Sequence, residues 1–262
     1  YKPFHCEMGS VVVHLCTNND TIPLDEGNLA IKGAKVILKY LEEKGMTDRL
    51  GSNDVSIFLE KHLPIAAGIA GGSGNAAAVL LGINALAGNI LSLRELMEIG
   101  VRVGADVPFS LMMNACKNRE VLAELEGIRE ARSSAWVSGI GEVVEPADPV
   151  HRYVIMANPG VLVSTAEVYD GIDAMMDYRD DGGLFTNQLE PYVLAEFKEA
   201  AELKTAMQDK LNADCVLMSG SGPTMVAYYS DEEVARADFE LMSNADWRLD
   251  NWRMWYSECG CD

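Results

Sequence analysis

A run of small residues at positions 64–76 constrains the fold of this chain more than any other feature. The run is rich in glycine and alanine, and it lies between an apolar, β-branched segment and an alanine-rich one. Glycine lets the backbone come close to an anion and tolerates a positive φ. A helix that follows would direct its unpaired N–H groups and its positive dipole end at that anion. This segment, called the glycine loop below, predicts a phosphate-binding turn; by composition alone, it also fits a purely structural connection.

Length, charge and cysteine content narrow the class of protein. The 262 residues suffice for a large core, and we expect two lobes with a boundary near residues 145–152. The net charge of −19 disfavours nucleic acids and anionic membranes as partners. Six scattered cysteines favour a reduced, cytoplasmic setting, and the close pair Cys259 and Cys261 lacks the partners of a structural metal site. Because Tyr1 begins neither a signal peptide nor a Met-initiated chain, we expect a trimmed or incomplete sequence.

Periodicity and capping residues predict helices and strands in the mixed order of an α+β protein. Asn28 is a predicted N-cap, and Ser92 with Glu95 has the spacing of a capping box. The helix after the glycine loop is apolar almost all round, so we expect it to be buried. Strands are predicted at 11–16, 55–59, 153–157, 215–218 and 224–229, with an edge strand within 247–256. Helices are predicted at 29–45, 75–86, 92–104, 117–132 and 165–176, and after a cap formed by Ser230 and Glu233.

Three motifs follow one another in the order found in one superfamily. They are the glycine loop, Gly-Ala-Asp-Val-Pro at 104–108, and Ser-Gly-Ser-Gly-Pro-Thr at 219–224, called the serine–glycine turn below. Together they resemble the GHMP kinases. Within that superfamily the chain looks most like the 4-diphosphocytidyl-2-C-methyl-D-erythritol kinases. This likeness rests on Glu-Lys-His-Leu-Pro at 60–64, Gly-Ile-Gly-Glu at 139–142 and Asn-Gln-Leu-Glu at 187–190.

The resemblance implies a two-lobed α+β fold. Residues 1–148 would form an ATP-binding domain like domain 2 of ribosomal protein S5, N-terminally incomplete and with an insertion at about 114–138. Residues 149–262 would form a ferredoxin-like domain. The implied activity is a phosphotransferase that uses ATP and Mg²⁺ to phosphorylate the 2-hydroxyl of a cytidine-linked methylerythritol, in the non-mevalonate isoprenoid pathway. We expect a cytoplasmic monomer or weak homodimer that binds this small molecule.

The nucleotide site of the family maps onto the glycine loop. The resemblance implies that backbone N–H groups face the β- and γ-phosphates, with Mg²⁺ bridging them and Ser73 as a candidate contact to the metal. Lys61 would lie near the adenine, and a solvated lysine is the simpler alternative. Many family members carry a second serine where this chain has Gly74. The implied nucleotide-binding residues are Lys61, Pro64, Ala66, Ala67, Gly68, Ile69, Ala70, Gly71, Gly72, Ser73, Gly74 and Asn75.

The acceptor site of the family maps onto three other segments. Asp106 matches the catalytic base, although an aspartate in this position is most simply a turn residue. Thr165 and Tyr169 match positions that hold the cytidine, the tyrosine by stacking; packing against the core is the alternative for a helical tyrosine. The serine–glycine turn would approach the phosphates and the substrate. The implied substrate-binding residues are Asp106, Thr165, Tyr169, Gly220, Ser221 and Gly222.

Two departures from the family keep other functions open. The N-terminal Pro-x-x-Lys and Gly-Tyr-His patterns of the family are not recognisable, and residues 114–138 interrupt the likeness. One alternative is a GHMP kinase with another acceptor, such as homoserine, mevalonate or a sugar. The other is an inactive, truncated nucleotide-binding module.

Overall fold

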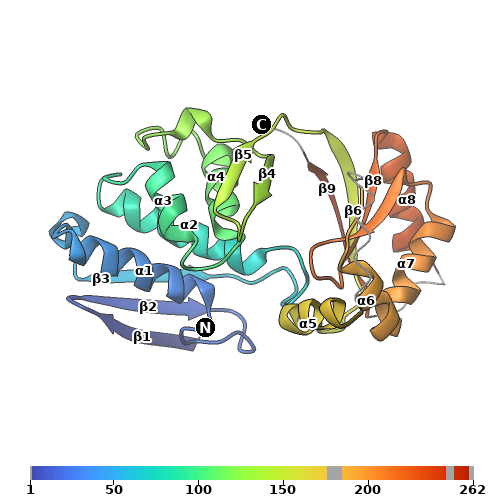
Figure 1. Cartoon of the computed structure of the whole chain (residues 1–262), viewed down its shortest axis with the longest axis horizontal. Coiled ribbons are helices and arrows are strands. Elements are labelled where there is room, and N and C mark those ends of the chain that lie inside the picture. The colour runs from blue at the N-terminus through green and yellow to red at the C-terminus, as the bar shows by residue number, and fades with distance from the viewer. Residues whose placement is uncertain (1, 176–184, 246–250, 260–262) are drawn as a thin grey trace. The chain divides into compact units, whose positions relative to one another are not determined.

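The computed structural model describes residues 2–175, 185–245 and 251–259, which form two compact units (Figure 1). The first unit contains the described residues of Tyr1–Leu63 and Ala70–Pro149. The second contains those of Pro64–Ile69 and Val150–Cys261. The glycine loop is thus divided, because its first half packs with the second unit and its second half with the first.

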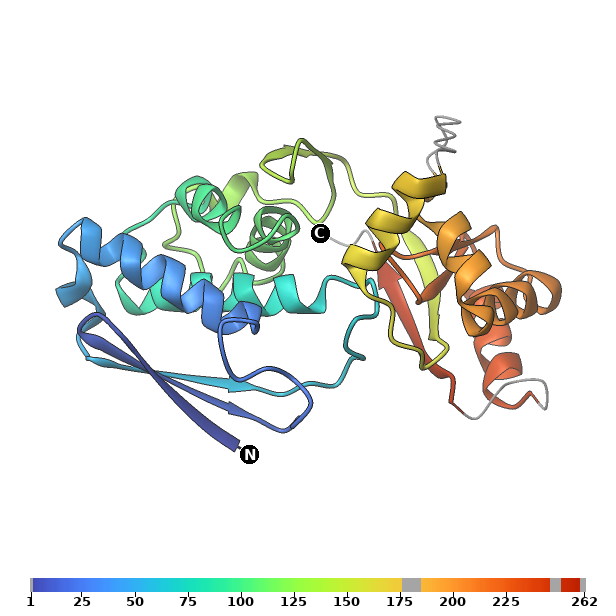
Figure 2. The ribbon, with the colours of Figure 1, turned by 60° about the horizontal axis from the view of Figure 1, so that its bottom comes forward.

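The first unit is a three-stranded sheet with helices packed on one face (Figure 2). β1 (Lys2–Met8) is antiparallel to β2 (Val11–Thr17), which is parallel to β3 (Asp54–Leu59). α1 (Leu29–Glu43) connects the two parallel strands, and alternate side chains of β2 pack against it and against α2 (Gly71–Leu86). The remaining elements are η1 (Thr47–Leu50), α3 (Leu93–Gly100), α4 (Val107–Lys117), η2 (Ile128–Glu130) and the hairpin of β4 (Ala135–Ser138) and β5 (Val143–Pro146).

The second unit is a four-stranded antiparallel sheet with the strand order β7-β8-β6-β9. Its strands are β6 (Arg152–Asn158), β7 (Cys215–Met218), β8 (Met225–Tyr229) and β9 (Arg253–Cys259), and its helices are α5 (Thr165–Met175), α6 (Glu190–Glu196), α7 (Lys198–Lys210) and α8 (Glu232–Ser243). Helices follow the first and third strands of the unit, and its first strand lies between the third and the fourth. This is the ferredoxin-like topology, so that prediction is confirmed, as is the mixed α+β class.

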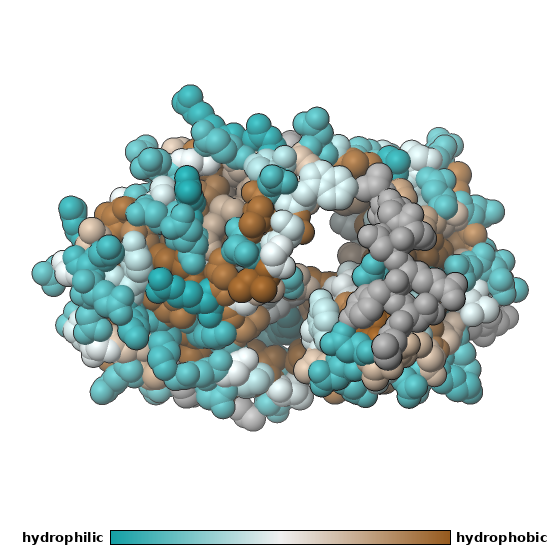
Figure 3. Space-filling model, viewed as in Figure 1, coloured by the Kyte–Doolittle hydropathy of each residue, from teal (hydrophilic) through white to brown (hydrophobic). Residues whose placement is uncertain are grey.

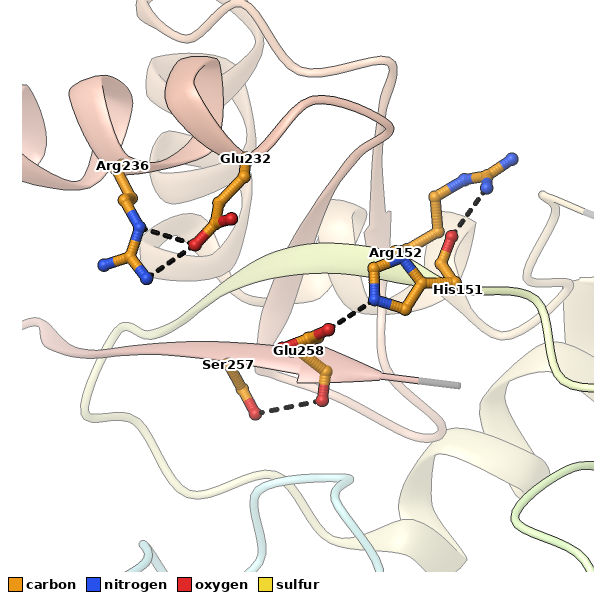
Figure 4. A network of polar contacts seen from close by, with 6 residues as sticks. All are labelled: His151, Arg152, Glu232, Arg236, Ser257 and Glu258. Carbon is orange, nitrogen blue, oxygen red and sulfur yellow. Dashed lines mark hydrogen bonds and ion pairs between the residues drawn. The ribbon is translucent and has the colours of Figure 1, made fainter. Parts of the chain in front are cut away.

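A hydrogen bond of His151 and an ion pair of Arg236 lie at the sheet of the second unit (Figure 4). His151, which precedes β6, contacts the carboxylate of Glu258 on β9 through Nε2. On α8, Arg236 pairs with Glu232 at 2.6 Å and lies over the ring of Tyr256. Hydrophilic side chains cover much of the face of the protein seen in Figure 3. Among the described residues, no helix is long and apolar enough to cross a membrane.

Two of the three capping signals predicted from the sequence are confirmed. The side chain of Asn28 accepts a hydrogen bond from the N–H of Ala30, so α1 begins where it was predicted to begin. The capping box at α3 is present as well, because Ser92 Oγ accepts from Glu95 N at 3.2 Å and Ser92 N donates to Glu95 Oε2 at 2.8 Å. At α8, however, the cap is Asp231 rather than Ser230, and its carboxylate accepts from two backbone N–H groups.

Other boundaries were wrong. α2 begins at Gly71 instead of residue 75, because Ala70 takes a left-handed conformation and starts the helix four residues early. α3 ends at Gly100 instead of Gly104, and 3₁₀-type hydrogen bonds continue the chain to residue 103. The segment 117–132 is turns and η2 beyond the last turn of α4, not a new helix. The edge strand is β9, displaced toward the C-terminus; residues 246–250 lie outside the described part. β1, β4 and β5 were not predicted.

The helix α2 is less buried than its apolar sequence predicts. Leu86 is 60% exposed, and in β3, the edge strand beside α2, Phe58 is 74% exposed. An open groove of about 1030 Å³ runs between this strand and α2. The expectation of a helix buried on all sides was therefore wrong, because among the described residues β3 has no neighbour on its outer edge.

Replacing Ser92 with alanine is expected to lower the free energy of unfolding by about 1 kcal/mol, because the N-cap of α3 is lost. The backbone and side-chain hydrogen bonds from Ser92 hold the pKa of Glu95 below its ordinary value. Stabilisation from this carboxylate is present above its unfolded pKa and is lost as the pH falls through the folded pKa. The loss of unfolding free energy caused by Ser92→Ala should therefore be smaller in acid. Denaturant unfolding at pH 7 and pH 3.5 measures this difference in unfolding free energy. Ser243→Ala is the control, and we expect it to change the free energy of unfolding little at either pH.

Candidate active site

The second half of the glycine loop is the start of α2 in the first unit. Ala70 occupies the N-cap position, and its side chain makes no capping bond. The first intrahelical bond is donated by Gly74 N to Ala70 O at 2.9 Å. The N–H groups of Gly71, Gly72 and Ser73 are therefore among those that an α-helix leaves unsatisfied at its N-terminus. Such a helix start favours an anion, by hydrogen bonding and by its dipole.

Lys61 adds a cation at the same place. Its backbone N–H donates to Asn18 Oδ1 at 2.8 Å, and a Cβ built on Gly71 would lie 3.0 Å from Lys61 Nζ. Burial lowers the pKa of this ammonium, and no carboxylate among the described residues forms an ion pair with it. A half-buried ammonium beside the positive end of a helix is electrostatically unfavourable unless an anion joins them. The geometry thus favours binding over the solvated alternative, and contact of Lys61 with adenine stays a prediction.

The first half of the glycine loop packs against the serine–glycine turn within the second unit. Gly68 has a φ of +69°, and a Cβ there would lie 2.2 Å from Ser219 O and 2.7 Å from Gly222 N. Ser219 Oγ also donates to Gly68 O at 2.8 Å. Only glycine fits such an approach of two backbones. Two motifs 151 residues apart in the sequence therefore meet. The implied residues Pro64, Ala66, Ala67, Gly68 and Ile69 lie in the second unit, whereas Lys61, Ala70, Gly71, Gly72, Ser73, Gly74 and Asn75 lie in the first.

The two residues matched to the cytidine position lie on one face of α5, also in the second unit. Thr165 begins the helix, and its Oγ1 lies 2.9 Å from the Oγ of Ser221 in the serine–glycine turn. Tyr169 follows one turn later and is 55% exposed, outside the hydrophobic core. Residues four apart lie on the same helix face. The alternative that Tyr169 serves core packing does not fit this exposure, and a ligand contact stays a prediction.

Asp106 stands at the start of α4 in the first unit, with its side chain exposed. Its backbone carbonyl accepts from Ser110 N at 3.0 Å, but its carboxylate makes no capping bond. An aspartate at this position commonly caps the helix with its side chain. The carboxylate of Asp106 is thus exposed and takes no part in capping α4, and its role as the catalytic base stays a prediction. Within the described residues this carboxylate has no ion-pair partner.

Sequence reasoning assigned no role to Gly141, which the structure places against the Asp106 segment. Gly141 has a φ of +97°, and a Cβ there would lie only 2.0 Å from the carbonyl oxygen of Ala105. The turn at 139–142 therefore rests directly on the residue before Asp106. The motif at 139–142 had been noted only for its family resemblance. A required positive φ could not be read from Gly-x-Gly alone.

The described residues contain no group of three His, Cys, Asp or Glu side chains that could hold a metal ion. Mg²⁺ typically keeps several waters and binds through one or two protein groups together with substrate phosphates. The side chain of Ser73 is buried at the start of α2.

A family model for the N-terminal domain of GHMP kinases matches residues 28–114, which include the glycine loop, Lys61 and Asp106. The fold and the site thus define a kinase of the GHMP class. The chain is 32% identical over 255 residues to the 4-diphosphocytidyl-2-C-methyl-D-erythritol kinase of Alkaliphilus oremlandii (strain OhILAs), covering 90% of this chain and 77% of the relative. It is 36% identical over 232 residues to that of Clostridioides difficile (strain 630), covering 82% and 69%.

Solved structures agree with these relatives. A crystal structure of 4-(cytidine 5'-diphospho)-2C-methyl-D-erythritol kinase superposes with a TM-score of 0.67 at 26% identity, covering 95% of this chain and 82% of the other. A homoserine kinase from Cytophaga hutchinsonii shares the fold, with a TM-score of 0.58 at 17% identity, 94% of this chain and 81% of the other. The chain belongs to the 4-diphosphocytidyl-2-C-methyl-D-erythritol kinase family.

Proposed function

We propose that this chain transfers the γ-phosphoryl group of ATP to the 2-hydroxyl of 4-diphosphocytidyl-2-C-methyl-D-erythritol, in the non-mevalonate route to isoprenoid precursors. The phosphotransferase activity is supported by the position of Lys61 beside the start of α2, where no side chain caps the helix. No carboxylate among the described residues pairs with Lys61 there. The cytidyl substrate rests on family membership. The domains would be 1–148 for ATP and 149–262 for the second lobe, in a cytoplasmic monomer or weak homodimer.

Each part of the site has a chemical role in this proposal. The N–H groups of the glycine loop would bind phosphate oxygens and balance their charge. The Lys61 ammonium lies beside Gly71 at the start of α2, which favours a phosphate contact for it over the adenine contact that the resemblance implies. Ser73 would contact a Mg²⁺ ion bound together with ATP, and that ion would supply positive charge to the phosphates. Asp106 takes the proton of the acceptor hydroxyl as its oxygen bonds to the γ-phosphorus and the bond to ADP breaks. Thr165 and Tyr169 hold the cytidine, the tyrosine by stacking.

An acceptor panel tests this function. Purified protein with ATP and Mg²⁺ is expected to release ADP with the cytidyl substrate, and kcat/KM for it should exceed that for homoserine, mevalonate or galactose by at least about 100-fold. Coupled ADP detection and mass spectrometry of the product measure it. A preference for a non-cytidyl acceptor would contradict the substrate assignment. ATP binding without turnover of any acceptor would support the alternative of an inactive module.

A further inference from the structure

The serine–glycine turn is held from the side of α6 by one asparagine. Asn187 Nδ2 donates to Met218 O and to Gly220 O, both at 2.8 Å, while its Oδ1 accepts from Leu189 N at 2.9 Å. The two donated bonds span the entry into the turn, and the accepted bond fixes the amide to the chain before α6. Every bond here is to backbone, so the position of the turn depends on the amide itself.

A second side chain, that of Glu190 at the start of α6, supports the same segment. Glu190 Oε1 accepts from Met218 N at 2.9 Å and pairs with Lys204 Nζ of α7 at 2.5 Å. The two charged side chains are only 12% and 14% exposed. Burying an ion pair costs desolvation energy, so such a pair is weak evidence for a gain in stability. Its geometry does, however, fix Glu190 against the end of β7.

A cavity lies beside the hydrogen bonds that Asn187 and Glu190 make to this segment. A cavity of about 280 Å³ in the second unit is lined by Asn187, Glu190 and Lys204, together with Val216 and Leu217 of β7. Its lining also includes apolar residues of α5 and of the chain before and at the start of α6, among them Ile172, Phe185 and Pro191. Without the amide of Asn187, Met218 O and Gly220 O would lose the hydrogen bonds that they accept from this side chain.

The bond to Gly220 O also sets the direction of a donor. The carbonyl of Gly220 and the N–H of Ser221 belong to one planar peptide unit and point in opposite directions. Because Asn187 holds the carbonyl, the N–H of Ser221 is directed away from α6. The Ser221 hydroxyl meets Thr165 and the Ser219 hydroxyl meets Gly68, so the turn is fixed from both sides.

We propose that Asn187 is a positioning residue for the reaction: it fixes the serine–glycine turn, and through it the Gly220–Ser221 peptide, against Thr165 and the glycine loop. Glu190 assists by holding Met218. Asn187 itself touches no reacting atom. This inference rests on the proposed function for its effect on turnover, but its structural part can be tested independently.

The test uses Asn187→Ala and Asn187→Asp in the full chain. The aspartate keeps the shape and the acceptor for Leu189 N, but it replaces both donors with oxygen. Asn212→Ala is the matched control. Asn212 also donates a hydrogen bond through Nδ2 within the second unit, but its acceptor is Asp238 of α8 and not a residue of the turn. Hydrogen exchange of residues 218–222, the thermal midpoint, and kcat and KM for the cytidyl substrate are measured for each.

Both Asn187 variants are expected to speed hydrogen exchange at 218–222 and to lower kcat/KM by about 10- to 30-fold, the factor that two neutral hydrogen bonds represent. Asn212→Ala should lower the thermal midpoint without either effect. Unchanged exchange at the turn, or faster exchange with unchanged kcat/KM, would overturn the proposal. If the wild-type protein does not turn over the cytidyl substrate, the proposed function fails, while exchange at 218–222 still decides whether Asn187 positions the turn.

Discussion

Replacing Asp106 with asparagine is expected to lower kcat by at least about 100-fold, because an alcohol is a poor nucleophile without a group that takes its proton. Asparagine has nearly the same shape but cannot accept the proton. The affinity for ATP should stay close to that of the wild type, since the Lys61 and α2 groups that would bind phosphate are unchanged. Initial rates of ADP release and calorimetric titration with an unreactive ATP analogue measure the two quantities.

The fold should tolerate this change. The Asp106 side chain is exposed and makes no capping bond, so the free energy of unfolding is expected to move by no more than about 0.5 kcal/mol. Asp48→Asn, an exposed aspartate in η1 of the same unit, is the matched control and should leave kcat unchanged. Equal turnover in Asp106→Asn and the wild type would exclude Asp106 as the base. A loss of ATP affinity parallel to the loss of kcat would instead indicate a role in nucleotide binding.

The elements that sequence predicted well are those whose signals are local. The caps at Asn28 and Ser92 each involve a side chain and a backbone group two or three residues away, so the sequence contains both partners of the bond. Strands β2, β3 and β8 are short apolar runs with few alternative structures. In such segments, the residues within the element are enough to determine its type of secondary structure.

The segment after α4 is one for which the helix prediction was wrong. Its apolar residues have helical spacing, and Leu122 and Leu125 are indeed buried, but Val121 is 83% exposed. Gly127 has a φ of +85°, which interrupts any helix there. The carbonyl of Glu126 accepts from Leu93 N at 2.8 Å, so the segment is tied to the start of α3. A tertiary contact of this kind overrides a weak periodic signal, and no short window of sequence contains it.

The residues proposed for the site could be named from the sequence, where their roles stay predictions, but their contacts could not. The glycine loop and Asp106 could be found because their motifs are contiguous. The approach of Gly68 to Ser219 joins distant segments and was not deducible from spacing. The bonds of Asn187 to Met218 and Gly220 were hidden for the same reason, although the motif at 187–190 had been noted. A residue that acts by holding a distant segment in place is hard to recognise from the sequence, because its contacts join residues that are far apart in the chain.

Replacing Gly141 with alanine is the second change for which we expect a large effect. The backbone at Gly141 has a φ of +97°, where a Cβ is strained by about 1–3 kcal/mol. That Cβ would also lie 2.0 Å from Ala105 O, which is backbone and cannot rotate away. The two segments must therefore move apart, and we expect the segment that carries Asp106 to shift. A displacement of about 1 Å at a catalytic group costs on the order of 100-fold in rate, so we expect kcat to fall by about that factor.

Gly139→Ala separates this displacement from strain in the turn. Gly139 also has a positive φ, +69°, but its Cβ would meet only the carboxylate of Glu142, the flexible end of a side chain. Both variants should lower the thermal midpoint, because both place a Cβ in a left-handed conformation. Only Gly141→Ala should lower kcat strongly, because only there does the new atom press on the residue before Asp106. If the two variants lowered the thermal midpoint equally and both had the kcat of the wild type, the 139–142 turn would have no part in positioning the base.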